Sequence, residues 1–319
     1  MRAYFAEEAG DRKVEAFALF NVFYQTGILV GPLVGLVFLG VSFRSVCMVA
    51  ALLFLALLAL QARALPSRSG DCGPPGQTML ADWRQAVANR PFLLFSLAMI
   101  GSYVLNFQVY LGLPIEVRRA TGGEMGVAIM FAVSGLLTIL GQVRVTAWVK
   151  ARWAPLRAIT YGLLLLASAF VPLALASTVA NAPPAGQTGG VHPWWLYAAR
   201  LSPVIAGALL LSLATMIIYP FEMATIVSLA GSRAVGTYYG LYNALSGIGI
   251  AAGTLLTGAA LDVGRGVGIP ALPWVVLTAT GCGCAVAVWR LDRGGRLDSG
   301  SQPAGPTMSA PAVQGGFRR

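Results

Sequence analysis

The chain has 319 residues, of which 57% are hydrophobic and 11% are charged, and its 22 Lys and Arg against 12 Asp and Glu give a net charge of +10. Soluble domains carry roughly 25% charged residues, and a chain this apolar cannot bury its hydrophobic surface inside a water-soluble fold. The composition excludes a soluble globular enzyme, a disordered protein and a disulfide scaffold. It predicts an all-α, polytopic membrane helix bundle.

Eight stretches without Asp, Glu, Lys or Arg are the predicted membrane-spanning helices. A helix needs about 20 apolar residues to cross a hydrocarbon core roughly 30 Å thick. The turn-forming residues 181–190 divide the fifth stretch, which therefore holds one helix, about Leu156–Val179, and a loop. The uncharged stretches in chain order are Ala16–Phe43, Ser45–Ala62, Pro91–Ile115, Met125–Val143, Ala158–Ala199, Leu201–Phe221, Ala234–Leu261 and Gly266–Trp289.

The spacing of these helices predicts how the chain is divided. Residues 1–64 would be a two-helix remnant of an N-terminal bundle, and residues 65–90 a polar cytoplasmic linker with a short interfacial helix over about Met79–Asn89. Residues 91–290 would form a C-terminal six-helix bundle, and 291–319 a disordered cytoplasmic tail. Because transporters are often built from six-helix halves, two helices followed by six predict a transporter that lacks its first four helices.

The cationic residues predict the orientation of the chain. With eight spans, 17 of the 22 Lys and Arg fall on the side of the termini and 5 on the other side. Cytoplasmic loops are enriched in Lys and Arg, so both termini should be cytoplasmic and the protein should lie in the inner cell membrane. The basic residues are spread over short segments, which argues against nucleic-acid binding.

The first predicted helix carries a motif of small residues, Gly27, Gly31, Pro32 and Gly35. Glycines four residues apart lie on one face of a helix and allow a neighbouring backbone to approach closely. Pro32 removes a backbone hydrogen bond and kinks the helix. These residues predict a helix-packing face.

This motif resembles the one in the fifth helix of drug–proton antiporters of the major facilitator superfamily, except that Leu36 replaces the second closing glycine. The segment 219–262, which begins Tyr219-Pro220-Phe221-Glu222, is similar to the tenth and eleventh helices of that superfamily, and 106–114 to the end of the seventh. The resemblance extends from Met1 to about Trp289. It implies a partial major facilitator fold and proton-driven efflux of small, largely apolar or drug-like compounds by alternating access.

Glu222 is the leading candidate functional residue, because it is the only acid that the sequence places within a span. An ionised carboxylate inside a membrane costs a few kcal/mol or more. Glu222 should therefore face a cavity and bind a proton or a cationic substrate. The alternative is that it anchors the following loop through Arg144 or Arg233.

Uncharged polar residues in the spans have two interpretations: they form interhelical hydrogen bonds, or they line a cavity. These candidates are Gln25, Asn106, Gln108 and Asn243. Tyr219, together with Tyr24, Tyr110 and Tyr242, would supply aromatic surface for an apolar ligand. Trp194, Trp195 and Trp274 are predicted to belong to the aromatic belt at the membrane surface.

Two other classes of function compete with transport. An integral-membrane enzyme would need a polar catalytic cluster, whereas the sequence offers one histidine, His192, and no His/Asp or Cys/His grouping. The second alternative is a non-transporting scaffold or remnant. Neither a cofactor nor a metal site is predicted, because the four cysteines and His192 lack ligand spacing. The expected partners are the lipid bilayer, a small-molecule substrate and protons.

Overall fold

The computed structural model describes residues 12–39, 42–64, 79–179, 194–231 and 235–295, without the side chains of 32–39, 79–80 and 179. Within these residues every regular element is a helix. Eight helical segments of the described chain are long and apolar enough to cross a membrane. The predicted all-α, eight-span bundle is therefore confirmed.

The described residues form eleven helices, because two spans each consist of two helices and α4 lies outside the spans. In chain order they are α2 (Lys13–Leu39), α3 (Phe43–Ala64), α4 (Met79–Ala88), α5 (Arg90–Phe107), α6 (Gly112–Thr121), α7 (Met125–Lys150), α8 (Pro155–Ser168), α9 (Val171–Val179), α10 (Trp194–Ala230), α11 (Val235–Gly266) and α12 (Leu272–Arg293).

Two spans that the sequence predicts as single helices are interrupted. The helix expected over Leu156–Val179 breaks after Ser168, and the span Arg90–Thr121 breaks between Phe107 and Gly112. A proline lies just beyond each break, Pro172 and Pro114 respectively. Proline lacks an N–H, and its ring clashes with the carbonyl four residues earlier. For Pro172 that carbonyl belongs to Ser168, the last residue of α8.

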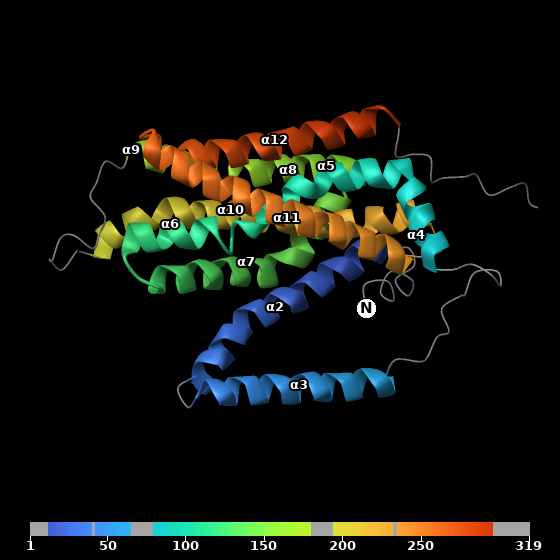
Figure 1. Cartoon of the computed structure of the whole chain (residues 1–319), viewed down its shortest axis with the longest axis horizontal. Coiled ribbons are helices and arrows are strands. Elements are labelled where there is room, and N and C mark those ends of the chain that lie inside the picture. Colours follow the sequence, from blue (N-terminus) through green and yellow to red (C-terminus); the bar gives the residue numbers. More distant parts are fainter. Residues whose placement is uncertain (1–11, 40–41, 65–78, 180–193, 232–234, 296–319) are drawn as a thin grey trace, which may run out of the picture.

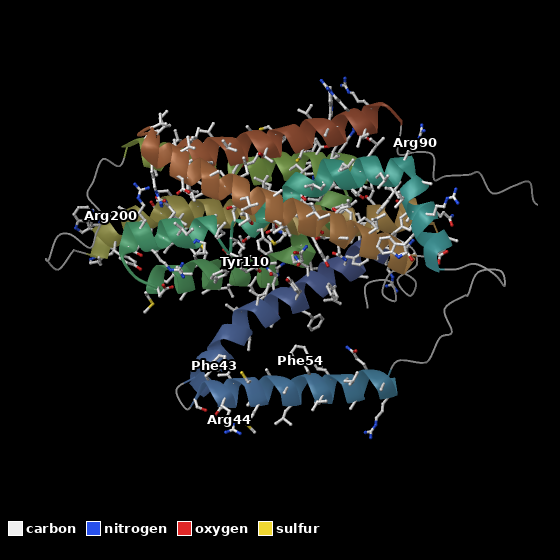
Figure 2. All side chains as sticks on the ribbon, viewed as in Figure 1. Phe43, Arg44, Phe54, Arg90, Tyr110 and Arg200 are labelled. Carbon is white, nitrogen blue, oxygen red and sulfur yellow. The ribbon has the colours of Figure 1, made fainter. Side chains whose placement is uncertain are left out.

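The helices α5 to α12 form one bundle, and α2 crosses its surface (Figure 1). The N-terminal half of α2 packs against α7 and α10, where Phe17 and Ala18 are buried. Farther along, α2 leans away from the bundle and is followed by α3 (Figure 1). Helix α3 contacts α2 and has no buried residue. Phe43 and Phe54 project from this separate helix and are 72% and 73% exposed (Figure 2).

Glycines allow close packing in the C-terminal bundle. A Cβ on Gly249 of α11 would lie 2.4 Å from Ile100, and one on Gly253 would lie 2.3 Å from Val104, both on α5. By contrast, no atom of the described residues would lie within 4 Å of a Cβ on Gly27 or Gly31. Gly27 and Gly31 thus do not pack closely against any described residue, because the contact with α7 is made by Leu29, which lies on the other side of α2 from these two glycines. Pro32 and Gly35 belong to α2, but their side-chain positions lie outside the described residues.

Charged and aromatic residues mark the two ends of the bundle. Arg44 and Arg200 lie at one end and Arg90 at the other (Figure 2). The count of spans in the sequence likewise assigns Arg44 and Arg200 to one side of the membrane and Arg90 to the other. Trp194 and Trp195 are exposed at the start of α10, as a surface belt requires. Trp274 does not fit that prediction. It is 2% exposed and stacks on Phe170 with ring centroids 6.4 Å apart, because α12 packs against α8 and α9, whose junction contains Phe170.

Candidate functional site

A cavity of about 250 Å³ lies among α2, α5, α7 and α10. Its wall is mainly apolar and aromatic, with a few polar groups. The aromatic side chains are Tyr24, Tyr103, Phe107, Tyr110, Phe131 and Tyr219, and the polar ones are Asn21, Gln25, Ser102, Asn106, Ser134, Ser212, Thr215 and Glu222. The ring of Tyr110 (Figure 2) lies against Phe131 of α7, with centroids 6.0 Å apart. This composition is typical of a site for small, largely apolar ligands.

Four of the six candidate residues from the sequence line this cavity. Gln25 comes from α2, Asn106 from α5, and Tyr219 and Glu222 from α10. The structure therefore brings together residues that are nearly 200 positions apart in the chain.

The other two candidates form hydrogen bonds elsewhere in the bundle. The amide of Gln108 donates to Val104 O at 3.1 Å and to Thr257 Oγ1 at 3.2 Å, so this buried side chain joins the α5 end to α11. Asn243 donates to Tyr239 O, one turn earlier in its own helix, at 2.8 Å. Neither residue is part of the cavity wall.

Glu222 is 3% exposed and lies on the cavity wall. Its Oε1 accepts a hydrogen bond from the hydroxyl of Tyr242 on α11. The ring of Tyr103 packs edge-on against Tyr242, with centroids 5.6 Å apart. The hydroxyl group of Tyr242 thus holds the carboxylate between α10 and α11, and the carboxylate faces a largely apolar space.

The alternative role for Glu222 is to anchor the next loop. The observed bond instead joins α10 to a neighbouring helix. Arg144 is exposed on α7, and Arg233 lies outside the described residues.

Pro220, two residues before Glu222, leaves a backbone carbonyl of α10 without its helical hydrogen bond. A proline inside a helix leaves the carbonyl four residues earlier without its usual N–H donor, and here that carbonyl belongs to Met216. The side chain of Gln142 on α7 supplies the missing donor, with Nε2 2.9 Å from Met216 O. Gln142 in turn accepts a hydrogen bond from Asn21 Nδ2 at 2.8 Å. Three helices, α2, α7 and α10, are therefore joined at the interrupted turn of α10.

Further contacts extend the pairing of α2 with α7. Lys150 forms an ion pair with Glu15, and a Cβ on Gly135 would lie 3.5 Å from Leu29. As the residue numbers rise on α2 they fall on α7, so the two helices are antiparallel and in contact over about four turns.

Sequence reasoning missed the polar residues of α7. Ser134, Thr138, Gln142 and Thr146 are all buried and recur every four residues. That spacing places them on one face of a helix. Ser134 also lines the cavity, and its hydroxyl has no hydrogen-bond partner within the described residues. The four-residue repeat of polar side chains in an apolar span is the signal that would have found them.

Comparison with known proteins places this architecture in a family. A family model described as Major Facilitator Superfamily matches residues 1–254. An uncharacterized MFS-type transporter of Mycobacterium tuberculosis is 40% identical over 313 residues, which cover 98% of this chain and 71% of that protein.

More distant relatives carry the name multidrug resistance protein MdtH. The protein from Edwardsiella ictaluri is 29% identical over 81% of this chain, and the one from Klebsiella pneumoniae strain 342 is 27% identical over 86%. The aligned regions cover 58% and 62% of those two relatives. By the match to the family model and the identity to the mycobacterial transporter, the chain belongs to the major facilitator superfamily.

Proposed function

We propose that the chain forms the substrate-binding part of a proton-coupled exporter of small, largely apolar compounds in the inner cell membrane. The observation that carries this proposal is the buried carboxylate of Glu222 on the wall of a mainly apolar cavity. The distant relatives named multidrug resistance proteins support the substrate class. The activity proposed is transport and not an enzymatic reaction.

The cavity wall supports a substrate with an apolar body and one cationic or hydrogen-bonding group. Aromatic rings of Tyr24, Tyr110 and Tyr219 offer flat apolar surfaces and attract cations. Gln25 and Asn106 offer amide groups that both donate and accept hydrogen bonds. Glu222 supplies the negative charge, so a compound with a protonated amine would be favoured over a neutral analogue of the same shape.

Proton coupling follows from competition at Glu222. A desolvated carboxylate is costly inside a membrane, and either a proton or a cationic substrate removes that cost. A proton and a cationic substrate compete for the same carboxylate, so binding of one favours release of the other. This exchange is what an antiporter requires.

A transport assay on Glu222→Gln tests this proposal. Glutamine keeps the size and hydrogen-bonding capacity of the side chain but cannot titrate. The assay measures proton-driven uptake of tetraphenylphosphonium, a lipophilic cation, into inverted vesicles, for the 319-residue chain and for any longer reading frame that contains it. We expect the variant to insert normally and lose pH-dependent transport, while Glu116→Gln, in the middle of α6, keeps it.

Other outcomes would favour the competing functions. An unchanged pH profile for Glu222→Gln at normal expression would exclude the proton role and leave a structural one. Absence of transport from every reading frame that contains the chain would favour a non-transporting scaffold. An enzyme would instead show turnover that depends on a polar cluster near the membrane surface.

We also propose that both termini are cytoplasmic, that residues 65–90 link residues 1–64 to the bundle 91–290, and that 291–319 form a tail. The cationic asymmetry supports the orientation. In a cysteine-free background, Gly123→Cys between α6 and α7 should react with an impermeant thiol reagent added outside intact cells. Ala151→Cys, which follows α7, should react only after permeabilisation. Both positions are exposed, and the reverse labelling pattern would invert the proposed orientation.

A further inference from the structure

A second hollow, of about 540 Å³, lies between α8 and α12 at the end of the bundle where Arg90 is found. Figure 1 shows α12 on the opposite side of the bundle from α3, so this groove does not open towards α2 or α3. Both α8 and α12 belong to membrane spans. The groove therefore faces the surrounding lipid and not the central cavity.

The groove has a charged rim and an apolar floor. Among the described residues, Arg157 and Arg293 lie on the rim with one carboxylate, Asp292, which leaves one net positive charge. The guanidinium of Arg293 lies over the ring of Trp289, 4.3 Å from its centroid, and this cation–π contact helps to fix its direction.

The floor continues from the rim towards the middle of the membrane. It is formed by side chains of α8 and α12, among them Leu164 and Val286, which are 44% and 45% exposed. Exposed apolar side chains along two spans offer a surface on which a hydrocarbon chain can pack. The groove thus combines a site for an anion with a site for an alkyl chain.

Aromatic residues beside the groove mark the level of the lipid headgroups. The ring of Trp153 lies 4.9 Å from Tyr161, a lining residue, and 5.3 Å from Trp148. Arg152 lies over Trp148 at 4.5 Å. Tryptophan and tyrosine concentrate at the boundary between hydrocarbon and water, so Arg157 and Arg293 are at the depth of lipid phosphates.

We propose that this groove binds an anionic phospholipid, with the phosphate between Arg157 and Arg293 and an acyl chain along Leu164 and Val286. Basic pockets between membrane helices are suited to anionic headgroups. A bound lipid would bridge α8 and α12 and stabilise their packing at this end of the bundle. This inference is independent of the proposed transport activity.

The first experiment compares two doubly substituted chains of equal charge. Delipidated chain in detergent is titrated with dioleoylphosphatidylglycerol, and the lipid-bound fraction is measured by native mass spectrometry. The groove variant is Arg157→Gln with Arg293→Gln. The matched control is Arg152→Gln with Arg290→Gln, which removes two exposed arginines at the same end that do not line the groove.

We expect the groove variant to bind phosphatidylglycerol at least about tenfold more weakly, since each basic residue near an anionic surface contributes about fivefold. The control should stay within about twofold of the parent chain. Asp292→Asn should bind more tightly, because it removes a carboxylate from the rim. Inorganic phosphate at millimolar concentration should not displace the lipid, because it lacks the acyl chain. Equal loss in both doubly substituted chains, or displacement by phosphate, would overturn the proposal.

A second measurement needs no change of charge. Phosphatidylglycerol brominated on one acyl chain quenches the fluorescence of nearby tryptophan. The difference in quenching between the parent chain and Trp289→Phe therefore reports lipid in the groove. This difference should be smaller when the brominated lipid in the same vesicles is phosphatidylcholine instead of phosphatidylglycerol. Equal quenching of Trp289 by the two lipids would show general contact with the bilayer and would refute a selective site.

Discussion

The hydrogen bond from Gln142 to the carbonyl of Met216 should depend on Pro220. With proline at position 220, Met216 O has no helical donor, and Gln142 Nε2 lies 2.9 Å away. Pro220→Ala supplies a backbone N–H that can donate to Met216 O within α10. The Gln142 side chain should therefore contribute more to the free energy of unfolding when residue 220 is proline than when it is alanine. A double-mutant cycle measures this difference directly.

The magnitude follows from the bonds that Gln142→Met removes while keeping the size of the side chain. Two interhelical hydrogen bonds are lost, to Met216 O and from Asn21 Nδ2, each worth about 0.6 kcal/mol on average in membrane proteins. The buried carbonyl of Met216, which then keeps only the long 3.5 Å bond from Thr146 Oγ1, adds up to about 1 kcal/mol. We expect Gln142→Met to lower the free energy of unfolding by about 2 kcal/mol in the parent chain and about 1 kcal/mol beside Pro220→Ala.

The assay is equilibrium unfolding of the purified chain in mixed micelles, titrated with sodium dodecyl sulfate and followed by circular dichroism. A coupling energy of about 1 kcal/mol between positions 142 and 220 supports the reasoning. Gln25→Met replaces an amide on α2 that lines the cavity, and it serves as the uncoupled control. Additivity of Gln142→Met and Pro220→Ala to within about 0.5 kcal/mol would refute the link between the proline and the α7 amide.

Three further predictions use single substitutions. Gly253→Ala places a Cβ 2.3 Å from Val104 and should lower the free energy of unfolding by about 1–3 kcal/mol. Gly258→Ala, whose Cβ would have no atom of the described residues within 4 Å, should be neutral in the same detergent titration. The buried hydroxyl of Ser134 has no hydrogen-bond partner among the described residues, so Ser134→Ala should not lower thermal stability. The substitution should weaken binding of tetraphenylphosphonium by less than about twofold. It should weaken binding of a hydroxylated analogue more, because the Ser134 hydroxyl lines the cavity. The hydrogen bond from Arg118 holds the pKa of Glu124 below its ordinary value. The stabilisation by this exposed ion pair should therefore be present above the pKa that Glu124 has in the unfolded chain, and it should be lost as the pH falls through the pKa of Glu124 in the folded chain. This pH dependence should be absent in Glu124→Gln. Thermal unfolding measured between pH 3 and 6 tests both expectations.

The spans were predictable because a single strong constraint produces them. A backbone that crosses a lipid bilayer must form helices or a closed barrel, and each helix needs about 20 apolar residues to cross. Charged residues at the ends of each stretch therefore revealed all eight candidate spans found among the described residues. The interruptions were harder to predict, because a proline in a membrane helix can kink it or break it. Pro220 lies within the continuous helix α10, whereas α8 ends four residues before Pro172.

The site was predictable only in part, because polar residues in a span have more than one use. Gln25, Asn106 and Gln108 look equivalent in the sequence, yet the first two line the cavity and the third donates to Val104 O and Thr257 Oγ1. The difference is set by which neighbour lies opposite each side chain, and that depends on contacts between helices distant in sequence. Hydrophobicity alone does not carry this information.

The residues of α7 show where additional information was present in the sequence. A single polar residue in this helix does not indicate a site, since serine and threonine can bond to their own helix, as Thr138 does to Ser134 O at 3.0 Å. The buried polar residues of α7 are Ser134, Thr138, Gln142 and Thr146. Their four-residue repeat means that one face of the helix is polar throughout. A polar face cannot point into lipid without cost, so it must meet other helices or a cavity. Pro220 adds a freed carbonyl that requires a donor from outside its own helix. The two features together favour a contact between α7 and α10, and the structure adds that Gln142 is the polar residue that makes it.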